Sequence, residues 1–184
     1  MLGSFFGRMD FMRHYIDCEF IEDGETIDLI SIAVVSEDGR EFYAINSEAD
    51  LSKANDWVKE NVIPLIPSAD HTPHMTRKAI ADALFQFVGF KPVFWGYCSA
   101  YDWVAVCQLF GAMKDLPPGW PMYCRDVKQF SDYLGSPKMP AQENEHDALA
   151  EAKWVHRAHL YLMELDRLQR DFTSEIPTRR FEQR

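Results

Sequence analysis

Residues 13–46 read RHYIDCEFIEDGETIDLISIAVVSEDGREFYAIN, and this pattern predicts three consecutive β-strands. Apolar and β-branched residues dominate each run, a polar turn around Asp23-Gly24 separates the first two, and Asp38-Gly39 is typical of a hairpin turn. Residues two apart on a strand share a face, so Asp17 and Glu19 project together, and residues 16, 18 and 20 take the opposite face. The segment therefore predicts an antiparallel meander that carries two acids side by side.

Two neighbouring carboxylates in a partly buried strand repel each other and resist the loss of water. A metal cation would compensate them, and so would an ion pair at the strand end. The same acid-x-acid spacing occurs elsewhere, for example at Glu48/Asp50, so the spacing alone does not identify a site. The apolar run around Asp17 and Glu19 distinguishes this pair and makes it a candidate metal site.

The rest of the chain alternates helices and strands. Helices are expected over residues 53–62, 76–88, 101–111, from about 127 to 134, and over 146–170; strands are expected in KPVFWGYC (91–98) and MYCRD (122–126). Prolines at 64, 67 and 73 indicate a loop. A meander followed by alternating strands and helices predicts an α/β fold, with a mixed five-stranded sheet flanked by helices.

Composition limits the possible functions. The chain has 184 residues, of which 47% are hydrophobic and 14% aromatic, which indicates one globular domain without a membrane-spanning segment. The net charge of -10 argues against broad binding of nucleic acid by a basic surface. A nuclease that holds phosphates with metal ions is compatible with that charge. The cysteines at 18, 98, 107 and 124 form no CxxC pair, and with no export signal they predict reduced thiols in a cytoplasmic protein.

Further acids stand at positions suited to the same site. Asp102 follows the apolar strand and falls in the first turn of a helix, where it is either a ligand or simply a favourable helix-start acid. His146 and Glu151 begin the last helix. A rise of about 7.5 Å over five helical residues would keep these two out of one metal shell. His146 would suit a general base at the entrance of the site, and Glu151 a metal ligand inside it. The alternative is a solvated helix start with Glu151 in a surface ion pair.

Taken in order, DCEF, GYCSAYDWVAVCQLFG and HDALAEA resemble the DEDDh 3'-to-5' exonucleases, and in particular the ribonuclease AS group of adenylate-preferring exoribonucleases. The resemblance runs from about Met12 to about residue 165. It implies an RNase H-like fold and a homodimer. We expect the domain to cover residues 12–172, with 1–11 as an N-terminal extension and 173–184 as a C-terminal tail. One departure is that the family carries aspartate where this chain has Glu151.

The resemblance also implies a set of roles. Asp17, Glu19, Asp102 and Glu151 would hold two Mg²⁺ or Mn²⁺ ions, which prefer carboxylate oxygens. His146 would take the proton from the attacking water, because histidine ordinarily titrates near neutral pH. Phe20 and Ile21 would meet the terminal sugar and base of the RNA. The expected reaction releases nucleoside 5'-monophosphates from adenylate-rich 3' ends.

Two alternatives stay open. The same fold and chemistry could act on DNA or on very short oligonucleotides, a choice that contacts with the 2'-hydroxyl decide. The other alternative is a nucleic-acid-binding module that has lost catalysis through Glu151. The histidine pairs His71/His74 and His156/His159 lack a third ligand, and we interpret them as loop residues and as side chains of the last helix.

Overall fold

The computed structural model describes residues 11–175. Its elements, in chain order, are β1 (Arg13–Glu22), β2 (Ile27–Ser36), β3 (Glu41–Asn46), η1 (Leu51–Lys53), α1 (Asp56–Asn61), η2 (Ile63–Leu65), β4 (His74–Met75), α2 (Arg77–Val88), β5 (Val93–Gly96), α3 (Ala100–Phe110), η3 (Met113–Asp115), β6 (Arg125–Asp126), α4 (Val127–Tyr133) and α5 (Ala148–Glu175). The predicted extension (1–11) and tail (173–184) lie outside this range except for Phe11 and residues 173–175. These domain boundaries stay predictions.

The predicted meander is present. β1 pairs antiparallel with β2, and β2 pairs antiparallel with β3. At the second turn Gly39 has φ +88°, and its N–H donates to the carbonyl of Ser36 at 2.9 Å. This left-handed backbone is the one that glycine adopts readily, which explains why Asp38-Gly39 marks the turn so clearly in the sequence.

The sheet contains six strands in the order β4-β3-β2-β1-β5-β6, so the predicted α/β architecture is confirmed with one strand more than expected. The extra strand is β4, which pairs parallel with β3 at the end of the proline-rich segment. Its ladder includes the Ile45 N–H donating to the Pro73 carbonyl and the Ser47 N–H donating to that of Met75. Two residues carry no periodicity, so a sequence pattern does not reveal such a strand.

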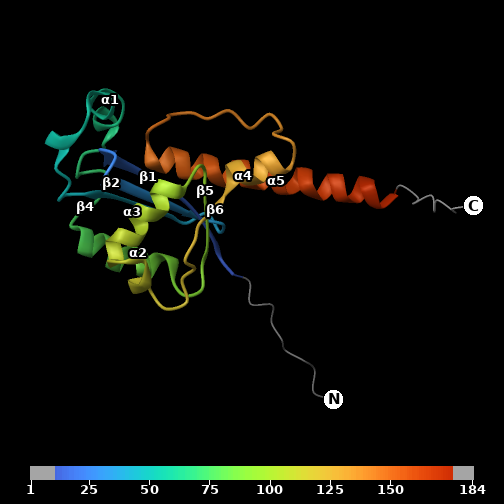
Figure 1. The fold of residues 1–184 in the computed structure, drawn as a ribbon, viewed down its shortest axis with the longest axis horizontal. Helices are drawn as coiled ribbons and strands as arrows, with labels where there is room; N and C mark the ends of the chain where they lie inside the picture. Colours follow the sequence, from blue (N-terminus) through green and yellow to red (C-terminus); the bar gives the residue numbers. More distant parts are fainter. Residues whose placement is uncertain (1–10, 176–184) are drawn as a thin grey trace, which may run out of the picture.

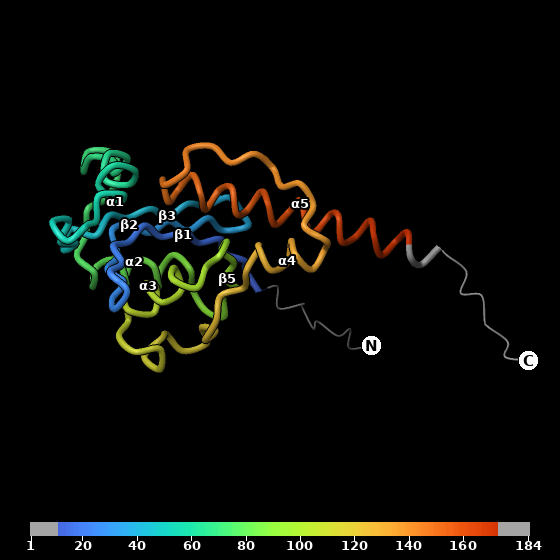
Figure 2. Tube along the Cα trace, turned by 45° about the horizontal axis from the view of Figure 1, so that its top comes forward, coloured from blue at the N-terminus to red at the C-terminus, as the bar shows by residue number. Residues whose placement is uncertain are grey.

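Helices cover both faces of the sheet (Figure 1). Figure 2 shows α2 and α3 on one face and α5 on the other. Between the sheet and α2/α3 lies a buried apolar cluster that includes Ile16 and Cys18, and between the sheet and α5 lies a second that includes Tyr15. The alternation predicted for the first strand is therefore confirmed. A third cluster packs α1 against the ends of β1 and β2.

Helix α5 begins two residues later than predicted and continues through Glu175. The Asp147 carboxylate accepts a hydrogen bond from the Ala150 N–H at 2.7 Å, so it caps the helix start. His146, with φ +68°, lies before the helix and not inside it. Within the part of the chain that the structure describes, none of the helices combines the length and apolar character needed to span a membrane.

Candidate metal and catalytic site

Strand β1 brings the first two acids together on the face that α5 covers. Asp17 is buried and Glu19 is half-buried. Their partners on β2 are Ala33 and Ser31, respectively, whose small side chains share that face. Small neighbours leave room above the two carboxylates, which larger residues at these positions would fill.

The third acid, Asp102, joins them through a bond to β1. Its Oδ1 accepts a hydrogen bond from the backbone N–H of Cys18 at 2.9 Å, and the side chain is buried at the start of α3. A helix-start acid without further duty would face solvent, so this contact with the strand between Asp17 and Glu19 favours the site interpretation.

Gly96 permits that approach. It ends β5 just before the turn into α3, and a Cβ added there would lie 2.5 Å from the Ser99 Cβ and 3.4 Å from the Ile16 carbonyl oxygen. Any side chain at residue 96 would therefore push the turn that carries Asp102 away from β1.

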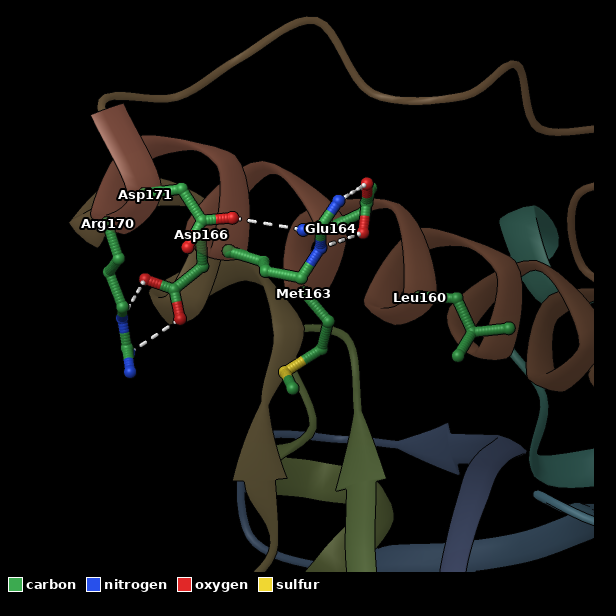
Figure 3. A pocket seen from close by; sticks show the side chains of 7 residues that line it. Leu160, Met163, Glu164, Asp166, Arg170 and Asp171 are labelled. Carbon is green, nitrogen blue, oxygen red and sulfur yellow. Dashed lines mark hydrogen bonds and ion pairs between the residues drawn. The ribbon is translucent and has the colours of Figure 1, made fainter. Parts of the chain in front are cut away.

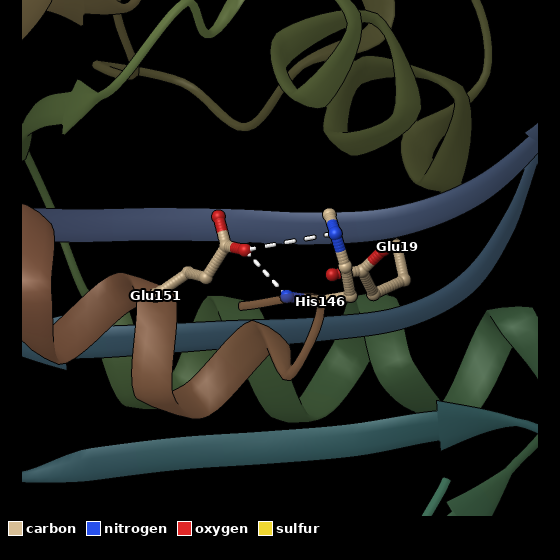
Figure 4. A group of neighbouring side chains, drawn as sticks. All are labelled: Glu19, His146 and Glu151. Atoms are coloured by element: carbon tan, nitrogen blue, oxygen red, sulfur yellow. Dashed lines mark hydrogen bonds and ion pairs between the residues drawn. The ribbon is translucent and has the colours of Figure 1, made fainter. Parts of the chain in front are cut away.

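His146 and Glu151 complete the group (Figure 4). One ligand atom from each of Glu19, His146 and Glu151 lies within 4.8 Å of the others. The Glu151 Oε1 accepts a hydrogen bond from the His146 backbone N–H at 2.6 Å and stands 4.0 Å from the His146 Nδ1. The prediction that these two side chains lie too far apart for one shell is wrong. Helical spacing does not apply, because His146 precedes α5 and its left-handed backbone folds it back.

Burial and neighbouring charges raise the pKa of three carboxylates of the site. Burial raises the pKa of Asp17 well above its usual range, and the charges of Asp102, Glu151 and Glu19 add to the rise. Burial together with Glu151 and Asp102 raises the pKa of Glu19 to about 8. Burial raises the pKa of Asp102 to about 7, although the hydrogen bond from Cys18 opposes the rise.

Positively charged side chains of the described residues do not offset the repulsion between these carboxylates. Among the described residues, no lysine or arginine forms an ion pair with Asp17, Glu19, Asp102 or Glu151. Four carboxylates without a compensating cation, with one imidazole beside them, form a donor set that hard divalent ions such as Mg²⁺ and Mn²⁺ prefer. The residues present therefore fit the metal ions that the sequence implies.

Sequence reasoning assigned no role to Asp147 or Trp57. Asp147 adds to the rise in the pKa of Asp17 and Glu19, but its side chain already caps α5. Trp57, on α1, makes an edge-to-face contact with His146, with ring centroids 4.8 Å apart. An aromatic residue on a short helix carries no sequence signal for such a contact, since it depends on how α1 docks.

The two residues expected to meet substrate differ in exposure. Phe20 is half-buried and lies beside Tyr101, which is 54% exposed, with ring centroids 5.9 Å apart. Ile21 is buried in the cluster under α1, and it lines an open depression of about 650 Å³ that Arg77 and Gln108 also border. A substrate contact by either residue stays a prediction.

The remaining predicted groups lie elsewhere. His71 lies in the loop before α2, as predicted, whereas His74 lies in strand β4, so the loop prediction is wrong for His74. His159 is buried, with its Nδ1 3.0 Å from the Tyr15 hydroxyl, and His156 stacks on the Tyr15 ring. The second pair thus packs against the sheet.

A hollow of about 510 Å³ on the outer part of α5 (Figure 3) bears no sign of chemistry. Arg167 pairs with Glu164 and Asp171, and Arg170 pairs with Asp166, so its charges compensate one another. Its nearest lining residue, Leu160, is about 13 Å along the helix from Glu151. The acid cluster is therefore the stronger candidate site.

Comparison with known proteins agrees with this geometry. Residues 12–163 match the family model of the 3'-5' exoribonuclease Rv2179c-like domain. Two Mycobacterium tuberculosis proteins, 3'-5' exoribonuclease Rv2179c of strain ATCC 25618 / H37Rv and 3'-5' exoribonuclease MT2234.1 of strain CDC 1551 / Oshkosh, are each 42% identical over 147 residues, covering 77% of this chain and 88% of theirs.

The fold has a solved counterpart. Escherichia coli Exonuclease I, in a crystal structure with a dT13 oligonucleotide, matches with a TM-score of 0.56 at 12% identity, covering 89% of this chain and 43% of that one. This likeness confirms the RNase H-like fold. The family model matches residues 12–163, and the relatives that are 42% identical align over 88% of their own length. The chain therefore belongs to the Rv2179c-like 3'-5' exoribonuclease domain family.

Proposed function

We propose that the protein is a divalent-metal-dependent 3'-to-5' exoribonuclease that releases nucleoside 5'-monophosphates from RNA, with adenylate-rich 3' ends as substrate. One observation carries the proposal. Four carboxylates from β1, α3 and α5 converge beside His146, and within residues 11–175 no lysine or arginine forms an ion pair with them. Family membership supports the choice of reaction, because the relatives that are 42% identical are named exoribonucleases.

Each residue has a role in this reaction. Asp17, Glu19, Asp102 and Glu151 would hold two Mg²⁺ or Mn²⁺ ions. When bound, such ions neutralise the phosphate and stabilise the attacking and departing oxygens. His146 accepts the proton of the attacking water. Phe20, with Tyr101 beside it, offers an aromatic surface for a terminal base, and Ile21 borders the same end of β1.

Glu151 does not favour a module that has lost catalysis. Its carboxylate reaches the group formed with Glu19 and His146 despite the extra methylene. The DNA alternative rests on the fold alone, since the structure with a DNA oligonucleotide is only 12% identical. The named activity of the 42% identical relatives favours RNA.

Two further properties belong to the proposal. A homodimer would cover the exposed apolar side chains on the outer half of α5, which include Leu160 at 53% and Phe172 at 69% exposed. Figure 1 shows this part of the helix extending beyond the sheet. Light scattering would measure the mass in solution. A cytoplasmic location accords with four cysteines that are all free.

The deciding experiment uses 5'-labelled adenylate-rich RNA, RNA of mixed sequence and matched DNA, with Mg²⁺ or Mn²⁺ and with or without EDTA. We expect a metal-dependent ladder on RNA, strongest on adenylates, with nucleoside 5'-monophosphate as product. A 3'-phosphate should block the reaction and a 5'-phosphate should not. Binding of RNA without shortening it would indicate the inactive module. Faster degradation of DNA than of RNA would indicate the DNA exonuclease alternative. Cleavage of circular RNA would indicate an endonuclease.

A further inference from the structure

Trp57 is a large apolar side chain left 53% exposed beside the candidate site. Its ring and the His146 imidazole meet at an interplanar angle of 81°, with centroids 4.8 Å apart. Edge-to-face geometry of this kind is the favourable arrangement for two aromatic rings. The contact joins α1 to the loop before α5, two segments far apart in the chain.

The His146 ring has little else to hold it. Its backbone N–H is bound by Glu151, but among the described residues no hydrogen bond reaches the ring, and its Nδ1 stands 4.0 Å from the Glu151 carboxylate. That separation is too long for a hydrogen bond. The side chain is also 33% exposed. A general base works only within hydrogen-bond reach of its proton, so a ring free to rotate into solvent would be inefficient.

Trp57 lies on a helix that is fixed to the sheet. Asn55 caps α1 by accepting a hydrogen bond from the Val58 N–H at 2.9 Å. Val58 is buried together with Ile21 and Ile30, so the helix is fixed to the ends of β1 and β2. Ile21 lies two residues after Glu19 on the same strand. The strand that carries the acids thereby also fixes the helix that carries Trp57.

We propose that Trp57 is a positioning residue that keeps the His146 imidazole turned toward Glu19 and Glu151. This inference rests on the proposed function, in which His146 accepts the proton of the attacking water. Trp57 touches the base and not the reacting atoms, so its loss should lower the rate of turnover and leave substrate binding nearly unchanged.

The first test is steady-state kinetics on labelled RNA with saturating Mg²⁺. Trp57→Ala should lower kcat about 3- to 10-fold, the worth of one aromatic contact, with KM within about twofold of the parent. Trp57→Phe keeps a ring and should recover most of the loss. Glu60→Ala, on the exposed side of the same helix, and Tyr133→Ala, an exposed aromatic on α4, are the controls and should change neither constant. Melting temperatures report any loss of folding.

The second test is a double-mutant cycle with His146→Ala. If Trp57 acts through His146, Trp57→Ala should have no further effect in that background. The His146 ring-proton resonances should also shift in Trp57→Ala, because they lose the ring current of the indole. An equal loss in both backgrounds would overturn the inference, as would a raised KM with unchanged kcat, which would make Trp57 a stacking surface for RNA. An inactive parent would refute the proposed function and this inference together, whereas an active parent with a fully active Trp57→Ala refutes this inference alone.

Discussion

The Glu151 carboxylate reaches back to the His146 backbone and accepts its N–H at 2.6 Å. Few side chains could do this from five residues farther along, and the reach depends on the left-handed conformation of His146. Aspartate, which the sequence resemblance leads one to expect here, is one methylene shorter. The glutamate therefore links the candidate ligand set to the loop that holds the candidate base.

Replacing Glu151 tests that link. Glu151→Ala should lower both metal affinity and turnover, by at least about 100-fold in turnover, because it removes a negative charge from the ligand set. Glu151→Asp should retain more of both but lose some rate, because the shorter side chain no longer reaches the His146 N–H. Calorimetric titration with Mn²⁺ and single-turnover rates would separate the two effects. If Glu151→Ala matched the parent in both, Glu151 would be only a helix-surface acid.

His146→Ala should separate binding from catalysis. Metal affinity should stay close to that of the parent, because the four carboxylates remain. The rate should fall about 10²- to 10⁴-fold, the usual worth of a positioned general base. The same two measurements apply, and a large loss of metal affinity would instead make His146 a ligand.

Asp17→Asn should abolish metal-dependent turnover and yet stabilise the metal-free protein. The neutral amide removes one of the charges that repel Glu19 and Asp102. For a chain of this size, each kcal/mol gained raises the Tm by about 2–4 °C. Thermal melts in EDTA would measure the gain, with Asp82→Asn, an exposed acid on α2, as the matched control. Substantial residual activity would show that Asp17 is not a required ligand.

The metal-free protein should lose stability as pH rises. The folded-state pKa values of Glu19 and Asp102, about 8 and about 7, lie above those of the unfolded chain. The folded state therefore holds these protons more tightly, and their contribution to stability disappears as pH rises through 7 and 8. Binding of Mg²⁺ requires the deprotonated acids, so the Tm gained on adding it should grow between pH 6 and pH 9. A Glu19→Gln variant should show a flatter dependence in EDTA, and identical slopes would contradict this account.

Two buried histidines should act in the opposite direction at low pH. Burial lowers the pKa of His14 and of His159 to about 4, below the ordinary value of 6.5. Their neutral forms stabilise the fold above about pH 6.5, and this contribution is lost as pH falls toward 4, at up to about 3 kcal/mol for each histidine. Urea unfolding of His159→Gln between pH 7 and 4.5 should show a weaker pH dependence than the parent. His71→Gln, an exposed control, should match the parent.

Much of the fold follows from local patterns. Strand alternation and the Asp38-Gly39 turn predict the meander, and the cap at Thr76 predicts the start of α2, where its hydroxyl accepts the Ala79 N–H. Strand β4 escapes prediction because its two residues are too few to show a periodic pattern. The predicted start of α5 is two residues too early because the helical sequence pattern continues back to His146. The left-handed backbone of His146 excludes that residue from the helix.

The candidate site was predictable only in part. The shared face of Asp17 and Glu19 follows from strand geometry, whereas the place of Asp102 beside them came from a family resemblance. Contacts across the fold had no sequence signal. The hydrogen bond from Cys18 to Asp102 and the ring contact of Trp57 both depend on how helices dock against β1.

Gly96 gives the site a weakness that the acids and the histidine do not reveal. A single methyl group there would meet the Ser99 Cβ at 2.5 Å, at the turn that leads to Asp102. A chain with Gly96→Ala would keep every acid and the histidine in its sequence while the third acid is pushed away from the other two. A family member with such a substitution would lose activity without losing a motif residue. Genome surveys that count motif residues would still classify it as an enzyme.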